Sequence, residues 1–173
     1  SYGLELYLKK NTGKTTGWIS YTLSKTQRQI DGINGGRAYA ASYDRRHNLN
    51  VVMMHEFNDR FTFSATFVYG TGRPIGLPAG RFEFDGYVGG QYPDRNSVRL
   101  KAYNRMDVSL TINSRKNKNR KWQGSWNISV YNVYARKNPW TVYTTNKSDG
   151  SGKELTMLYF PAPIPSITYN FSF

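Results

Sequence analysis

Cysteine is absent from the sequence, and histidine occurs only twice, at His47 and His55. Without cysteine the chain can form no disulfide framework and no thiolate metal site. Two histidines this far apart do not indicate a zinc site, and the sequence contains no HExxH motif. No set of acids, bases and nucleophiles suggests a catalytic arrangement. We therefore expect no enzymatic activity and no cofactor.

Acidic residues are scarce as well, since 11 Asp and Glu stand against 24 Lys and Arg in 173 residues, a formal net charge of +13. Basicity of this size predicts acidic partners, such as nucleic acid, anionic lipid or a phosphorylated surface. Long apolar runs are also missing. None approaches the roughly 20 residues that a membrane-spanning helix requires.

What the sequence does contain is a repeated alternation of apolar and polar residues. Between 61 and 69 the odd positions hold Phe, Phe, Ala, Phe and Tyr, while Thr, Ser and Thr fill the even positions 62, 64 and 66. Residues 106–113, 122–130 and 166–173 divide in the same way, and no segment keeps a helical stripe. A period of two predicts β-strands with one apolar and one polar face. The expected strands are residues 2–10, 15–28, 46–57, 60–71, 103–115, 121–136 and 160–173.

The connections between these strands alternate in length. Those after Lys10, at Asn58 and at Lys116 are short, whereas those starting at Gln29, Gly72 and Lys137 are long and rich in Gly, Pro, Asn and Tyr. Short turns at one end and long loops at the other are typical of a transmembrane β-barrel, with the long loops outside. A water-soluble sandwich has no reason to sort its connections in this way.

Charge placement favours the same interpretation. Residues 61–71, 122–135 and 164–173 contain no charged side chain, although the outward face of a soluble sheet normally carries Lys, Glu or Arg. An uncharged polar face suits a lumen, and the apolar face would then meet lipid. Aromatic residues near the strand ends suit the two interfacial girdles of a barrel, although the core of a sandwich would explain each of them as well. They are Trp18, Phe57, Phe61, Tyr69, Trp122, Tyr134 and Phe173.

Five stretches carry a more specific resemblance: "SYDRRHNLNVV", "YGTGRPIGLPAGRF", "YNRMDVSL", "NVYARKNPW" and the terminal "PAPIPSITYNFSF". In this order they resemble the final strands of TonB-dependent outer-membrane receptors, especially the SusC-like branch and its relatives. The resemblance covers essentially the whole chain and implies an all-β, antiparallel transmembrane β-barrel segment. Its seven or so strands would correspond to the last strands of a 22-stranded barrel.

The family implies energy-coupled import of a nutrient such as a glycan, peptide, siderophore or other large solute. It also implies a Gram-negative outer membrane, contact with its lipid and lipopolysaccharide, and TonB acting through an N-terminal plug. Neither plug nor TonB-contacting segment is recognisable in residues 1–173. Because a single-chain bacterial barrel needs an even number of strands, we expect Ser1 to be an internal boundary of a longer chain that supplies the other strands and the plug. A surface lipoprotein is a further implied partner.

The terminal strand resembles the signal by which the outer-membrane insertion machinery recognises the last strand of a barrel. Ile167, Tyr169, Phe171 and Phe173 form an apolar ladder on one predicted face, beside a free backbone edge. Thr168 stands where this signal usually has a small residue. The alternative interpretation is that residues 160–173 form an ordinary last strand without a signal function.

Several groups are candidate contacts. Asp44, Arg45, Arg46 and His47 are interpreted as an outer rim, with the arginines near lipid phosphates or Asp44, where the chain enters the membrane. Arg105 and Asp107, two residues apart, are expected to form a lumenal pair or to contact the plug. The long loops offer residues for stacking and hydrogen bonding to substrate, with plain solvation or lipopolysaccharide contact as the alternative. They are Tyr39, Tyr43, Tyr87, Tyr92, Arg73, Arg81, Arg95 and Arg99.

Two other interpretations were weighed. "SRKNKNRKW" has five basic residues and looks like a nucleic-acid patch, but its position between two amphipathic strands favours a turn facing headgroups or water, so we expect no nucleic-acid partner. The functional alternative is a soluble or surface-exposed all-β module that binds carbohydrate through its tyrosines. A requirement for detergent separates that alternative from the membrane protein.

Overall fold

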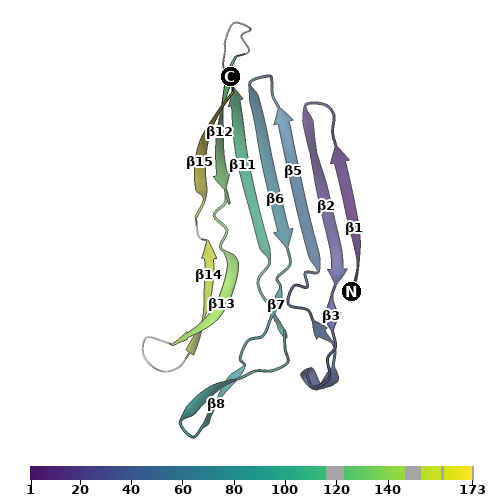
Figure 1. Cartoon of the computed structure of the whole chain (residues 1–173), viewed down its shortest axis with the longest axis vertical. Helices are drawn as coiled ribbons and strands as arrows, with labels where there is room; N and C mark the ends of the chain where they lie inside the picture. Colours follow the sequence, from purple (N-terminus) through teal and green to yellow (C-terminus); the bar gives the residue numbers. More distant parts are fainter. Residues whose placement is uncertain (116–122, 147–152, 161, 173) are drawn as a thin grey trace.

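The computed structural model describes residues 1–115, 123–146, 153–160 and 162–172. Seven strands form one antiparallel sheet in the order β1-β2-β5-β6-β11-β12-β15 (Figure 1). Their bounds are Tyr2–Lys10, Thr15–Lys25, His47–Glu56, Phe61–Gly70, Tyr103–Asn113, Gln123–Tyr131 and Ile164–Ser172. The prediction of an all-β fold with a seven-stranded antiparallel sheet is confirmed. Within the described residues β1 and β15 pair only with β2 and β12, so this sheet is open.

The register of the sheet brings the apolar positions of all seven strands to one face, because directly paired residues of an antiparallel sheet point to the same side. We call this the apolar face. Its paired positions include Leu4 with Leu23, Tyr21 with Leu49, Phe67 with Met106, Val108 with Val130 and Trp126 with Tyr169. The opposite side is the polar face, where Ser20 pairs with Asn50, Ser64 with Ser109 and Ser129 with Ser166.

No second layer formed by the described residues covers either face of the sheet. Among the described residues the buried hydrophobic side chains are Tyr39 and Ala41, and both lie in a connection rather than in the sheet. Large apolar side chains on the apolar face are exposed, including Leu8, Ile167 and Phe171. The hydrophobic contacts of the sheet are therefore made between neighbouring strands and not with a core. In the described part of the chain no helix has the length and hydropathy to cross a membrane.

Three long connections leave the sheet at the end opposite the short turns, as Figure 1 shows. The first long connection (residues 26–46) contains β3 (Gln27–Arg28), the short 3-10 helix Asn34–Gly36 and β4 (Tyr39–Ala40). The second (71–102) contains β7 (Pro74–Ile75), β8 (Gly80–Phe84), β9 (Tyr87–Gln91) and β10 (Val98–Arg99). The third (132–163) contains β13 (Asn138–Asn146) and β14 (Lys153–Phe160). These short strands pair as β3 with β4, β7 with β10, β8 with β9 and β13 with β14.

Two strands end earlier than the alternation predicts. The strand expected over 15–28 stops at Lys25 because the next amide, that of Thr26, donates to the Asp44 side chain at 2.6 Å instead of to a neighbouring strand. The strand expected to reach 136 stops at Tyr131 because Asn132 turns into the left-handed region, with φ of 54°. Asparagine tolerates that conformation better than most residues. The last strand begins at Ile164 rather than at 160.

Trp18 differs from its predicted place in the lipid-facing girdle. It pairs with Lys9 and Val52, one position away from Ile19, and therefore lies on the polar face with Ser20. Its ring is 6.0 Å from that of Tyr7, which is also on the polar face. Aromatic character alone suggested the girdle, but the two-residue period decides the face.

Candidate functional site

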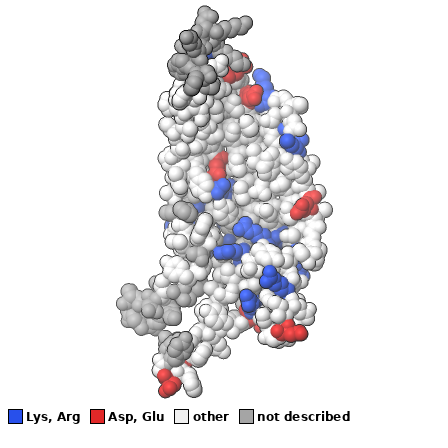
Figure 2. Space-filling view, viewed as in Figure 1, with Lys and Arg blue, Asp and Glu red and all other residues white. Residues whose placement is uncertain are grey.

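The candidate site lies at the loop end of the sheet, where the strands meet the long connections. On the face shown in Figure 2, lysine and arginine side chains gather densely at this junction, while much of the strand surface beyond it is uncharged. Three groups of residues occupy the junction: a buried ion pair, a cluster around Arg105, and a basic pocket.

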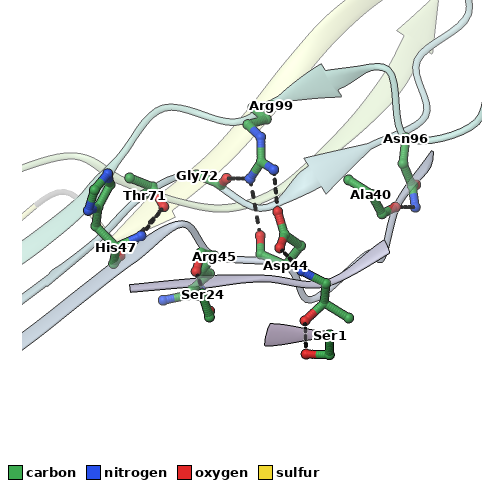
Figure 3. Close-up of polar contacts among 11 residues, drawn as sticks. Ser1, Ser24, Ala40, Asp44, Arg45, His47, Thr71, Gly72, Asn96 and Arg99 are labelled. Atoms are coloured by element: carbon green, nitrogen blue, oxygen red, sulfur yellow. Dashed lines mark hydrogen bonds and ion pairs between the residues drawn. The ribbon is translucent and has the colours of Figure 1, made fainter. Parts of the chain in front are cut away.

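The buried ion pair joins Asp44 of the first long connection to Arg99 of the second (Figure 3). Asp44 is only 2% exposed. One carboxylate oxygen accepts the Thr26 amide at 2.6 Å, and the other accepts Arg99 Nη2. Arg99 Nη1 also donates to the backbone oxygens of Asp44 at 3.2 Å and of Gly72 at 3.1 Å. One guanidinium thus links the first long connection to the second, and we call this pair the loop clamp.

The environment of Asp44 sets its protonation state. Burial by itself raises the pKa of a carboxyl group, because it penalises the charged form. The hydrogen bonds from Arg99 and from the Thr26 amide, with the charges of Arg99 and Arg46, outweigh burial and lower the pKa of Asp44 below its ordinary value. Asp44 is therefore ionised at neutral pH. In the third long connection, burial raises the pKa of the Tyr134 phenol.

The four residues predicted as an outer rim have different environments. Asp44 is paired with Arg99, 55 residues away, rather than with the arginines beside it. Arg45 is exposed and Arg46 half-buried. His47 begins β5; its Nδ1 lies 2.8 Å from Tyr21 Oη, and its amide donates to Thr71 Oγ1 at 3.1 Å.

Arg105 and Asp107 lie on the polar face of β11 and form an ion pair of 3.0 Å. Arg105 Nη1 donates to Tyr131 Oη at 2.8 Å and to Tyr103 Oη at 3.1 Å, and the guanidinium lies over the Tyr131 ring at 4.3 Å. Asp107 Oδ1 accepts the amide of Asn132 at 2.9 Å. Each charge of this pair is thus held by further hydrogen bonds, which reduces the cost of half-burying it.

A pocket of about 440 Å³ opens beside this cluster, between the ends of β6 and β11 and the start of β13. We call it the basic pocket. Arg45, Arg73 and Lys101 line it, together with the rings of Tyr103 and Trp140. Arg73 Nη2 donates to the backbone oxygen of Trp140 at 3.3 Å, so the second and third long connections meet at its wall. None of the described lining residues is acidic.

Two other contacts hold the first and second long connections together. Arg37 and Asp94 form an exposed ion pair of 2.9 Å. The Asn34 side chain accepts the amide of Arg95 at 2.7 Å. Arg95, predicted as a substrate-contacting loop residue, therefore contributes its backbone to loop packing.

The loop residues predicted to contact substrate differ in their exposure to solvent. Tyr39, in β4 of the first connection, is only 7% exposed, so its ring is not presented to solvent. Tyr43 and Tyr92 are exposed. Arg81 and Tyr87 lie in the hairpin of β8 and β9, but their side chains are outside the described part of the structure.

The C-terminal ladder lies on β15. Ile167, Tyr169 and Phe171 all point to the apolar face, where the Tyr169 ring lies 4.7 Å from that of Trp126 and 6.2 Å from that of Phe171. Phe173, the last member of the predicted signal, lies outside the described residues.

The places that Arg99, Lys101 and Trp140 occupy at this junction were not predicted from the sequence. Arg99 was assigned to substrate capture, yet its guanidinium is occupied by the loop clamp. Lys101 and Trp140 were not singled out for binding. No local sequence pattern predicts the pairing of Arg99 with Asp44.

No group of three or more side chains suited to a metal ion comes together within the described residues. Comparison of the sequence and structure with protein-family models, curated proteins and solved structures found no match.

Proposed function

We propose that this chain forms part of a transmembrane β-barrel in a Gram-negative outer membrane, and that the barrel is an energy-coupled importer. The observation that carries the membrane proposal is a seven-stranded sheet with one apolar and one largely uncharged polar face and no buried core in its described residues. Its strands are 9 to 11 residues long. That is the length with which a tilted strand crosses the hydrocarbon region of a bilayer.

Hydrophobic energetics support lipid as the solvent of the apolar face. Removing a Leu, Ile or Phe side chain from water contributes about 1.5–3 kcal/mol. The sheet leaves many such side chains exposed, among them Leu8, Ile167 and Phe171, so contact with lipid would recover a large free energy. On the polar face, hydroxyl and amide groups and one hydrogen-bonded ion pair suit contact with water or with a plug.

The importer part of the proposal is supported by the resemblance to the last strands of TonB-dependent receptors and by three long connections at one end of the sheet. In a receptor of this kind the connections would face outward and contact substrate and lipopolysaccharide. The remaining strands, a plug and TonB would complete the transporter. The insertion machinery would recognise β15, and a surface lipoprotein is a further candidate partner.

Tryptophan quenching by lipid tests the membrane proposal, because Trp126 lies on the apolar face and Trp18 on the polar face. Two variants of the complete barrel that contains this chain would each keep one of these tryptophans, with the other tryptophans replaced by phenylalanine. In liposomes of acyl-chain-brominated phosphatidylcholine, we expect strong quenching of Trp126 and little quenching of Trp18. Equal quenching of the two, or none, would refute the assignment of the faces.

A soluble carbohydrate-binding module has less support. A sandwich needs two sheets whose apolar faces pack together, and the seven long strands lie in one sheet. The same liposome experiment separates the two functions, since a soluble module remains monomeric and folded without detergent and does not partition into vesicles.

A further inference from the structure

We propose that the basic pocket binds a soluble anionic ligand that also presents an apolar ring face, which is the chemistry of an acidic saccharide. This inference rests on the proposed import function, because it names the class of solute that the importer would take. It assigns the anionic group to Arg45, Arg73 and Lys101 and the ring to Trp140 and Tyr103.

Three arginines at this end of the molecule are already paired with a carboxylate, whereas two cations of the pocket are not, in the part of the chain that the structure describes. Arg37, Arg99 and Arg105 each form an ion pair with an aspartate. Within the described residues Arg45 and Lys101 have no such partner, and both side chains are exposed. Gathering like charges without a counter-charge is unfavourable, and a bound anion would reverse that cost. The formal charge of +13 would also draw anions toward the molecule.

Trp140 and Tyr103 provide the aromatic surface that would contact the ring of the ligand. Trp140 is 65% exposed although it belongs to a strand, β13. Two residues earlier, the Asn138 side chain fixes the start of this strand to β11, because it donates to the Asn104 backbone oxygen at 2.6 Å and accepts the Asn104 amide at 2.9 Å. An exposed aromatic ring held beside cations suits a ligand with an apolar face, because ring surface and charge are then satisfied by one molecule.

The location of the pocket favours a soluble ligand over a lipid headgroup. Tyr103 pairs with Gly70, so both belong to the polar face of the sheet. Arg45 lies over Gly70: a Cβ atom there would be 2.9 Å from Arg45 Nη1. The pocket therefore opens on the side opposite the apolar face, which in the proposed barrel is the side that lipid does not reach.

Binding can be measured with the full chain in detergent micelles, using tetragalacturonate as the acidic probe and its methyl ester as the neutral one. We expect the acid to bind at least tenfold more tightly than the ester, a difference of about 1.4 kcal/mol. Arg45→Gln and Lys101→Gln should each weaken binding of the acid about tenfold and leave binding of the ester unchanged, because each removes a charge-assisted hydrogen bond. Trp140→Ala should weaken the binding of both the acid and the ester.

Arg37→Gln is the matched control, since it removes an exposed arginine that is paired with Asp94 away from the pocket, and it should change binding less than twofold. Equal affinity for acid and ester, or unchanged affinity in both glutamine variants, would overturn the inference. Displacement of the acid by equimolar inorganic phosphate would overturn the role of the ring. If a chain that passes the tryptophan test binds neither sugar, the ligand inference is overturned and the membrane proposal stands. If the chain binds the acid but fails the tryptophan test, the membrane proposal is overturned and the ligand inference stands.

Discussion

Replacing Asp44 by alanine should loosen two long connections at once, because the ion pair of Asp44 with Arg99 holds the first connection to the second. Removing one partner of a buried ion pair costs about 3–5 kcal/mol. Arg99 is 39% exposed at its side chain, so water recovers part of its solvation and about 2–3 kcal/mol is a better expectation here. At 1.36 kcal/mol for each factor of ten, that corresponds to roughly 30- to 150-fold easier local opening.

Amide hydrogen exchange measures this opening at two positions that Asp44 does not bond with its side chain. The Ala41 amide donates to the Thr26 oxygen at 3.0 Å in the first connection, and the Leu100 amide donates to the Arg73 oxygen at 3.1 Å in the second. Both should exchange about 30-fold faster or more in Asp44→Ala.

The control for this experiment is Asp94→Ala, which breaks the exposed pair with Arg37 and should alter exchange at these two amides by less than about threefold, as surface ion pairs contribute little. Two results would refute the reasoning. One is acceleration at Ala41 with Leu100 unchanged, which would mean that the clamp does not couple the connections. The other is an equal effect of the two alanine variants.

Two further predictions concern pH and the faces of the sheet. Because the pKa of Asp44 is lowered, its stabilisation is fully present above the ordinary carboxyl pKa and is lost as the pH falls through the lower, folded value. Arg99→Gln should raise the pKa of Asp44 and move this loss to higher pH, seen in the titration of the Thr26 amide resonance; an unmoved midpoint would contradict it. Val108→Arg should destabilise the protein in liposomes by about 2–4 kcal/mol, and the adjacent Ser109→Arg by less than about 1 kcal/mol, measured by reversible urea unfolding. Equal costs would contradict the proposed faces.

The sheet was predictable from sequence because its signal is local and repeated. Alternation over 61–69 determines which side chains share a face, and the same rule applied to Trp18 corrects its girdle assignment. Strand ends were less predictable. Lys25 ends β2 because the next amide bonds to Asp44, and that contact depends on a fold already formed.

The sequence carries a local signal for the hairpin of β8 and β9, which lies within the second long connection. Asp85 and Gly86 both have positive φ, 49° and 76°, and an Asp-Gly pair between two short apolar segments is a strong hairpin signal.

The basic pocket could not be predicted in this way, because its residues come from three separate connections. Arg45, Lys101 and Trp140 lie far apart in sequence, and no local pattern predicts their meeting.

The edges of the sheet bear on the proposed location. β1 and β15 are each nine residues long, and within the described residues each has one strand neighbour. Alternate residues of an edge strand point both backbone groups outward, which leaves about eight to ten unpaired groups on each edge. In water these groups are solvated, but at membrane depth each unsatisfied group costs several kcal/mol. A membrane location for the apolar face therefore requires that both edges be paired with further strands, so the lipid-facing sheet and the larger barrel are one proposal rather than two.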